Sequence, residues 1–248
     1  MKSAVLGQHF LINKRTIERI VGVAEVNADD HVVEIGTGEG FLTEWLLKTG
    51  CEITSYEVDE RLFQITKERF KGYSRLHLKL GDGFATKEDF DVVVSSLPYY
   101  ASRRFVEWMA TQHIPKGVVL LQKEFVDKMM SSPSTKKYGT YSVLSQHCFK
   151  MEELFLVPPD DFFPRPKVLS SVIRLSRVRS VLDGEGCARK LKILFSYRGR
   201  KISRFIKDAS KKRGWKVCDA LPNFFSDMRV EGMSPDQAME LVRCIGSG

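Results

Sequence analysis

The chain has 248 residues, of which 43% are hydrophobic and 28% charged, with a formal net charge of +8. This composition predicts one large domain, or a domain with a small partner, and excludes a disordered tail. Runs without a charged residue, such as 92–102, are too short to span a bilayer. Five scattered cysteines, five scattered histidines and an N-terminus without a clean apolar core favour a cytoplasmic protein with neither a disulfide framework nor a metal site.

Short apolar runs alternate with helical patterns through the first half of the chain. The pattern predicts strands at 31–35, 52–58, 76–80, 91–95 and 117–122, and helices at 41–48 and 60–70. Runs of β-branched residues without alternation indicate strands that are covered on both faces. The alternation of strands and helices therefore predicts a doubly wound parallel α/β sheet, which residues 154–157 and 171–175 are expected to close.

The C-terminal part has a different character. A break at 180–186 predicts a first domain of residues 1–180 and a small helical domain of residues 181–248. Apolar residues from 191 to 209 recur at helical spacing, and Gly199 interrupts the pattern, so two helices are possible there. Residues 189–216 contain twelve Lys or Arg and one acid, Asp208. A solvated helix face is the usual origin of such a run, but the asymmetry with the rest of the chain favours a polyanion as partner.

The first predicted strand leads into a glycine-rich turn, Glu34-Ile35-Gly36-Thr37-Gly38-Glu39-Gly40. Glycines at alternate positions let the backbone turn tightly and approach a ligand at the start of the next helix. The spacing differs from the dinucleotide fingerprint G-x-G-x-x-G, and two carboxylates suit a cationic ligand better than a pyrophosphate. The turn therefore disfavours an NAD-linked oxidoreductase.

Acidic residues also follow the next two predicted strands. Glu57 lies 21 residues after Gly36, close to the spacing at which an acid binds ribose hydroxyls, and Asp82 could accept a hydrogen bond from an adenine amino group. Each acid taken singly is more often a helix cap or a turn residue. Because the carboxyl ends of parallel strands share one crevice, Glu34, Glu57 and Asp82 together predict an adenosine ligand with a positive centre, which is S-adenosylmethionine.

The fourth predicted strand ends in Ser95-Ser96-Leu97-Pro98-Tyr99-Tyr100. In a methyltransferase sheet, a polar–apolar–Pro–aromatic tetrapeptide at this place serves the methylation of an amino group. The Ser96 hydroxyl and a backbone carbonyl near Leu97 could accept the two hydrogens of an adenine amine, while Tyr99 stacks on the base. The methyl donor is already activated, so positioning and electrostatics carry such a reaction without a strong general base.

These motifs resemble one family, the small-subunit ribosomal RNA adenine dimethyltransferases. The resemblance runs from Gly7 to about Ala209 and includes Gly7-Gln8-His9-Phe10-Leu11, Glu34-Ile35-Gly36, Leu97-Pro98-Tyr99, Leu121-Gln122-Lys123-Glu124, Tyr138-Gly139, Val157-Pro158-Pro159 and Phe162-Phe163-Pro164-Arg165-Pro166-Lys167-Val168. It implies a Rossmann-like methyltransferase sheet with a small C-terminal helical domain. It also implies methyl transfer to two adjacent adenines in a hairpin loop near the 3′ end of small-subunit rRNA, with a role in ribosome biogenesis.

The resemblance assigns a role to individual residues. The residues expected to bind S-adenosylmethionine are Gln8, His9, Leu11, Glu34, Gly36, Gly38, Glu57, Asp82 and Ser96. The residues expected to hold the target amine and base are Ser96, Leu97 and Tyr99, with Phe162 stacking on the other face of the base. The excess of positive charge in residues 189–216, and not the resemblance, assigns RNA binding to Arg198, Arg200, Lys201, Arg204 and Lys207, which are expected to lie close together on a helix.

The chain departs from the family pattern at two positions. Ser96 and His9 each stand where the family usually has Asn. Because a Ser side chain is shorter than Asn, the target amine must come closer or be held by the backbone alone. His9 is still expected to contact the cofactor, although the family usually has Asn at this position.

Two alternatives to a small-subunit rRNA dimethyltransferase stay open. One is an adenine methyltransferase that acts on another RNA, such as large-subunit rRNA. The other is an RNA-binding ribosome-assembly factor with weak chemistry, to which only Ser96 points. The basic segment and residues 121–124 favour the small subunit. The expected acting form is a monomer without a metal or a membrane partner, bound to small-subunit rRNA or to an assembling small ribosomal subunit.

Overall fold

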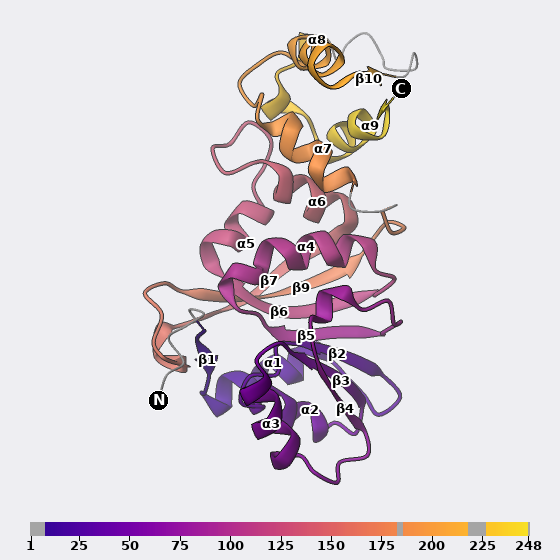
Figure 1. The fold of residues 1–248 in the computed structure, drawn as a ribbon. Helices are drawn as coiled ribbons and strands as arrows, with labels where there is room; N and C mark the ends of the chain where they lie inside the picture. Colours follow the sequence, from indigo (N-terminus) through magenta and orange to yellow (C-terminus); the bar gives the residue numbers. More distant parts are fainter. Residues whose placement is uncertain (1–7, 183–185, 218–226, 248) are drawn as a thin grey trace. The chain divides into compact units, whose positions relative to one another are not determined.

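The computed structural model describes residues 8–182, 186–217 and 227–247. The chain divides into two compact units, residues 1–126 with 150–177 and residues 127–149 with 178–248 (Figure 1). The chain changes unit three times, and the third change, between Arg177 and Val178, lies near the boundary expected at 180/181. Residues 127–149 were expected in the first domain but group with the C-terminal segment. The domain boundary itself stays a prediction. Gly7 and residues 183–185 of the expected break lie outside the described residues.

A seven-stranded sheet forms the centre of the first unit, with the strand order β4-β3-β2-β5-β6-β9-β7 (Figure 1). The strands are β2 His31–Ile35, β3 Glu52–Glu57, β4 Leu76–Leu80, β5 Val92–Ser96, β6 Lys116–Gln122, β7 Phe149–Val157 and β9 Ser170–Arg177. The five strands from β4 to β6 pair in parallel, and β9 runs antiparallel to β6. The predicted doubly wound sheet is therefore confirmed. Its order reverses between β2 and β5, which is where such sheets bind their ligands.

Helices flank this sheet (Figure 1). The first-unit helices are α1 Lys14–Ala24, α2 Phe41–Leu47, α3 Glu60–Arg69 and α4 Ser102–Thr111, and α5 Lys123–Met129 follows β6. Consecutive residues of the central strands, such as Val32 and Val33, have no exposed surface, as expected for strands that are covered on both faces. The Asn13 side chain caps α1 and the Asp59 side chain caps α3 by accepting backbone N–H groups of the first turn.

The second unit is mostly helical. Its helices are α6 Thr140–Cys148, α7 Gly186–Phe195, α8 Ile202–Arg213 and α9 Pro235–Arg243, and a short antiparallel pair joins β10 Trp215–Val217 to β11 Ile245–Ser247. The interruption at Gly199 does separate two helices, α7 and α8. The strand pair β10–β11 is not evident from the sequence, because its partners lie about 30 residues apart and each has only three residues. None of the described helices has the length and apolar character needed to cross a membrane.

Candidate active site

A pocket of about 300 Å³ opens at the carboxyl ends of the parallel strands in the first unit. All nine residues that the sequence assigned to a cofactor line it: Gln8, His9, Leu11, Glu34, Gly36, Gly38, Glu57, Asp82 and Ser96. The volume lies at the lower end of the range for small-molecule sites. Other residues also line the pocket without a signal in the sequence that assigns them to it, among them Phe10, Tyr100 and Arg104. That the nine residues share a pocket is observed, and that they bind a cofactor stays a prediction.

The glycine-rich turn after β2 forms the floor of this pocket. Gly36, Gly38 and Gly40 have φ angles of 84°, 57° and 80°, a region that residues with a side chain rarely adopt. A Cβ atom at Gly38 would lie 3.0 Å from Cδ1 of Phe10, and one at Gly40 would lie 2.4 Å from Cε2 of Phe70. Glycine is thus required here both by the backbone conformation and by the close approach of two aromatic rings.

Gly40→Ala is therefore expected to lower the free energy of unfolding by about 2–4 kcal/mol, from overpacking against Phe70 together with the strained φ. Gly72→Ala is the matched control, because Gly72 also has a positive φ, of 93°, but a Cβ atom at Gly72 would have no neighbouring atom within 4 Å. Denaturant unfolding of both variants measures the difference. Equal losses in the two variants would show that the contact with Phe70 contributes nothing.

Glu57 connects the turn after β2 to the turn after β3. Its side chain is buried, with 4% exposure. Oε2 accepts the Gly38 N–H at 2.8 Å, and Oε1 accepts the Asp59 N–H at 2.9 Å. A carboxylate oxygen can accept more than one hydrogen bond, so both oxygens keep capacity for hydroxyl groups in the pocket. The geometry is compatible with the predicted ribose contact.

Glu34 is the most deeply buried acid of the pocket, with 1% exposure. Its Oε2 accepts hydrogen bonds from the Thr43 and Ser55 hydroxyls, each at 2.7 Å. Burial raises the pKa of Glu34 to about 7, although the bonds from Thr43 and Ser55 oppose this rise and the charge of Glu57 adds to it. A positive ligand in the pocket would favour the ionised form and lower this pKa.

The raised pKa of Glu34 predicts a specific pH dependence of stability. The folded protein keeps the proton up to about pH 7, whereas the unfolded chain loses it near pH 4.5. The folded state therefore binds more protons between these values, and this group's contribution to stability falls as the pH rises from 4.5 to 7. Glu34→Gln should remove that fall and stabilise the ligand-free protein at pH 8, relative to pH 5, by about 2–3 kcal/mol.

Urea unfolding of wild type and Glu34→Gln at pH 5 and pH 8 measures this effect. Glu18→Gln, on the exposed side of α1, is the control and should leave the pH dependence unchanged. A Glu34→Gln protein with the wild-type pH dependence would show that Glu34 ionises normally.

Asp82 is held by two partners in the turn after β4. One oxygen, Oδ1, accepts the Phe84 N–H at 3.1 Å, and the other forms an ion pair with Arg104 of α4. The Arg104 guanidinium carbon lies 5.1 Å from the centre of the Phe84 ring, whose other contact is an edge-on packing against Trp108 at 5.7 Å. Arg104 and Trp108 are one helical turn apart, so α4 fixes the turn that carries Asp82.

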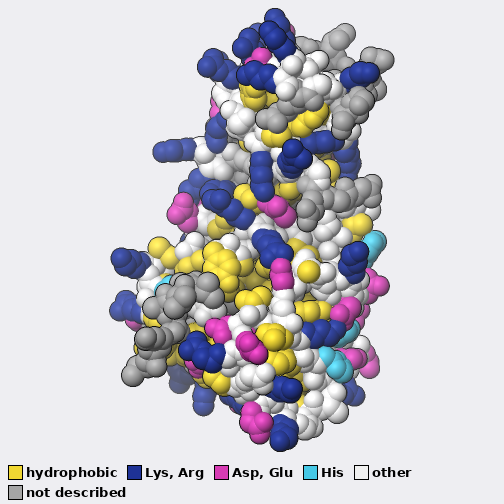
Figure 2. Space-filling model, viewed as in Figure 1, with side chains coloured by type: hydrophobic (Ala, Val, Ile, Leu, Met, Phe, Trp, Pro, Cys, Tyr) yellow, Lys and Arg dark blue, Asp and Glu magenta, His cyan; other side chains and the backbone are white. Residues whose placement is uncertain are grey.

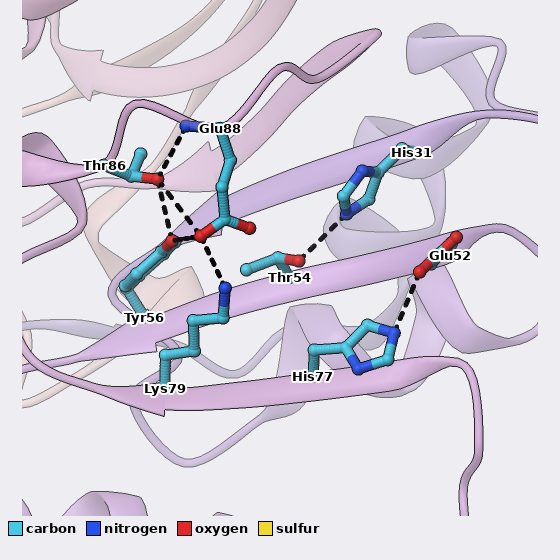
Figure 3. A network of polar contacts seen from close by, with 8 residues as sticks. All are labelled: His31, Glu52, Thr54, Tyr56, His77, Lys79, Thr86 and Glu88. Carbon is cyan, nitrogen blue, oxygen red and sulfur yellow. Dashed lines mark hydrogen bonds and ion pairs between the residues drawn. The ribbon is translucent and has the colours of Figure 1, made fainter.

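A polar network holds Thr86 and Glu88, in the segment between β4 and β5 (Figure 3). The Tyr56 hydroxyl lies 2.9 Å from both Thr86 Oγ1 and Glu88 Oε1. Glu88 also pairs with Lys79 of β4, which lowers the pKa of Glu88 and raises that of Lys79. Further along the same strands, His31 bonds Thr54 and His77 bonds Glu52 (Figure 3). Tyr56 itself lines the pocket, so the network connects the pocket wall to the loop after β4.

Ser96 and its neighbours lie at the end of β5. Ser96 lines the pocket, and within the described part of the chain no group hydrogen-bonds to its hydroxyl. The preceding Ser95 hydroxyl is instead used by the fold, since it donates to the Ile35 carbonyl at 2.6 Å. Leu97 is 2% exposed and belongs to the buried hydrophobic core. The Tyr99 ring lies outside the pocket lining, 5.5 Å from the His9 ring.

The structure contradicts the expected position of Phe162. The short strands β1 Phe10–Leu11 and β8 Phe162–Phe163 pair antiparallel, with Leu11 opposite Phe162 and Phe10 opposite Phe163. This register turns Phe162 into the hydrophobic core, where it is 3% exposed, and turns Phe163 outward, where it is 61% exposed. The Phe162 ring therefore presents no open face on which a base could stack.

The five basic residues assigned to RNA do not lie on one helix. Arg204 and Lys207 belong to α8, whereas Arg198, Arg200 and Lys201 precede it. Arg198 binds the protein itself, through an ion pair with Glu231 at 3.0 Å and hydrogen bonds to three carbonyl oxygens.

The other four cations are exposed, although two of them have acidic partners. Lys201 pairs with Asp227 at 2.8 Å and Arg204 with Asp208 at 3.2 Å. For Arg200 and Lys207, the described residues include no side-chain partner. Lys and Arg side chains gather over the helical unit in Figure 2. The described residues contain no group of three His, Cys, Asp or Glu that could hold a metal ion.

The sequence is similar to a family of known proteins and to named members of it. A family model described as "Ribosomal RNA adenine dimethylase" matches residues 2–245. A protein of Thermotoga maritima named "Ribosomal RNA small subunit methyltransferase A" is 36% identical over 193 residues, which cover 77% of this chain and 69% of that protein. A protein of the same name from Bacillus pumilus is 38% identical over 184 residues, which cover 69% of this chain and 63% of that protein.

Solved structures resemble nearly the whole chain. A dimethyladenosine transferase from Plasmodium falciparum matches with a TM-score of 0.76 over 94% of this chain and 95% of its own. Its sequence is 22% identical, so this match concerns the fold alone. The 23S rRNA methyltransferase ErmE matches with a TM-score of 0.64 and 26% identity over 94% of this chain and 98% of its own.

Proposed function

This chain belongs to the ribosomal RNA adenine dimethylase family, and we propose that it transfers methyl groups from S-adenosylmethionine to the exocyclic amines of adenines in small-subunit rRNA. The observation that carries this proposal is the pocket that brings together Glu34, Glu57, Asp82 and Ser96 at the end of the parallel sheet. Two adjacent adenines in a hairpin loop near the 3′ end are the proposed target. A cytoplasmic monomer is the proposed acting form.

The groups that line the pocket fit S-adenosylmethionine. Glu57 is a buried acceptor for the ribose hydroxyls, and Asp82 is an acceptor for the adenine amine. The left-handed glycine turn lets a ligand approach the backbone closely. Burial raises the pKa of Glu34 to about 7, and a positive charge nearby would stabilise the ionised form of this carboxyl group. When bound, the sulfonium supplies an activated methyl group.

The residues at the end of β5 would hold the target amine. The nitrogen lone pair of an adenine amine is delocalised into the ring, so the amine is a poor nucleophile. The free Ser96 hydroxyl would accept one amine hydrogen, and a backbone carbonyl near Leu97 would accept the other. These bonds would favour a more pyramidal nitrogen, whose lone pair would bond to the methyl carbon as the carbon–sulfur bond breaks; the neutral thioether would leave and the nitrogen would lose one proton to solvent. The aromatic face of Tyr99 would stack on the base.

Large-subunit rRNA is the second candidate substrate. The likeness to the 23S rRNA methyltransferase ErmE, at 26% identity over nearly the full length of both chains, favours it. The named relatives at 36% and 38% identity favour the small subunit. The two candidates share the same chemistry and differ in the RNA that reaches the pocket.

The test is methyl transfer from labelled S-adenosylmethionine to unmethylated small subunits, large subunits and deproteinised rRNA. We expect the label in small-subunit rRNA. Label confined to large-subunit rRNA would contradict the choice of substrate. A folded protein that binds RNA but labels none of these substrates would be the weakly active assembly factor instead.

The exposed cations of the second unit give a prediction about RNA binding. Phosphate contacts release counterions, so log affinity falls with log salt by about 0.7–0.9 per contact. Lys211 is a further exposed cation, on α8. Replacing Arg200, Lys207 and Lys211 by Gln should reduce this slope by about 2, and should weaken binding to most RNA sequences alike. The matched control exchanges Arg and Lys at the same three positions and keeps the charge. If both triple variants retain the wild-type slope, these residues do not contact phosphate.

A further inference from the structure

The Tyr99 ring is fixed at two points of the first unit. Its hydroxyl lies 2.7 Å from Oγ of Ser170, which belongs to β9 and pairs with Gln122 of β6. Its ring lies 5.5 Å from the His9 ring, tilted by 38°. His9 is fixed in turn, because its Nδ1 donates a hydrogen bond to the Pro164 carbonyl at 2.6 Å. The orientation of the Tyr99 ring is therefore set by the sheet and by the chain segment after β8.

The Ser170 hydroxyl hydrogen-bonds to the Tyr99 hydroxyl, whereas the hydroxyl of its neighbour Ser171 bonds to a different side chain. Both serines have no exposed surface. Among the described residues, the Ser170 hydroxyl has Tyr99 as its side-chain partner, whereas the Ser171 hydroxyl donates to Glu153 at 2.7 Å. Burial raises the pKa of Tyr99, and the bond with Ser170 opposes this rise. The phenol is therefore neutral at physiological pH and holds Ser170 through an uncharged hydrogen bond.

We propose that Ser170 is a positioning residue for methyl transfer, whose hydroxyl holds the Tyr99 ring in the orientation that receives the target base. The inference rests on the proposed function, because it assigns Tyr99 to the base. A ring that is fixed before the substrate arrives loses little freedom when the base stacks on it. Without Ser170, the phenol must find water, and the ring can turn about its side-chain bonds away from the productive geometry.

The proposal predicts the rates of four proteins: wild type, Ser170→Ala, Tyr99→Phe and the double variant. Each single variant should lower single-turnover methylation by about tenfold, because a small misplacement of the base contact slows transfer. The double variant should be no slower than either single variant, since both remove the same hydrogen bond. The dissociation constant for S-adenosylmethionine should stay unchanged in all four, because neither residue lines the pocket.

Ser171→Ala is the control for the loss of a buried serine hydroxyl on the same strand. It should lower stability without the tenfold loss of rate in the folded protein. Tyr99→Phe keeps the ring and the packing, so it tests the proposal even where Ser170→Ala folds poorly. Wild-type turnover in Tyr99→Phe, or losses of rate that add in the double variant, would overturn the role of Ser170. An inactive wild type that binds RNA would instead refute the proposed function.

Discussion

Glu57→Ala should weaken S-adenosylmethionine binding by about 100-fold, or about 2.7 kcal/mol. The ribose hydroxyls would lose a charged acceptor, a kind of hydrogen bond worth roughly 1.5–3 kcal/mol. The substitution would also release the N–H groups of Gly38 and Asp59, which Glu57 binds at 2.8 and 2.9 Å. The turn after β2 would then be less ordered before binding. Calorimetry with the purified variant measures the affinity.

Two comparisons make the Glu57 result specific. Asp59→Ala removes the cap of α3, and since Asp59 does not line the pocket, the affinity should change little. The RNA affinity of Glu57→Ala should stay close to wild type. If the folded variant binds S-adenosylmethionine as tightly as wild type does, the assignment of Glu57 to the ribose is wrong.

Arg198→Met should lower the free energy of unfolding by about 3 kcal/mol, because the Arg198 guanidinium connects its own segment to residues 135–138 and to Glu231. It pairs with Glu231 and donates to the carbonyl oxygens of Thr135, Lys136 and Tyr138. The backbone adds to this junction, since Glu231 N–H donates to the Arg198 carbonyl at 3.1 Å. Hydrogen bonds to charged groups contribute roughly 1.5–3 kcal/mol, and the freed carbonyls would have to find water.

Arg200→Met is the matched control for this prediction. Arg200 is two residues away and exposed, and the described residues give its side chain no partner, so its loss should cost less than about 0.5 kcal/mol. Denaturant unfolding measures both variants. A loss of the same small size in Arg198→Met would show that its contacts do not stabilise the unit. The salt dependence of RNA binding should respond in the opposite order, with Arg200 contributing more than Arg198.

The sequence predicts the central strands and the position of the pocket for one physical reason. A strand that is covered on both faces must be a continuous apolar run, and the ends of such runs in a parallel sheet converge at one edge. His31–Ile35 is buried along most of its length and is predicted to the residue for this reason, and Glu34, Glu57 and Asp82, at or just after the ends of their strands, do line one pocket. Arg104 was missed because the sequence does not show which residue of α4 faces the turn after β4.

The expected positions of Phe162 and of the basic residues are wrong for two different reasons. In a strand of two residues, nothing local decides which side chain points inward, so Phe162 and Phe163 could not be distinguished without the pairing of β8 with β1. The basic segment had a clear excess of charge, but composition does not reveal which cations have partners inside the protein. Arg198 forms its ion pair and hydrogen bonds with residues 33 to 63 positions away. Such contacts depend on how the second unit folds.

The proposed function requires that the protein methylates an adenine amine of small-subunit rRNA. Nucleoside mass spectrometry of small-subunit rRNA, after reaction of unmethylated subunits with the purified protein and S-adenosylmethionine, measures this product. We expect N6,N6-dimethyladenosine that is absent without the cofactor and strongly reduced with Glu57→Ala. Methyl groups on a ribose, on another base or on no nucleoside at all would contradict it.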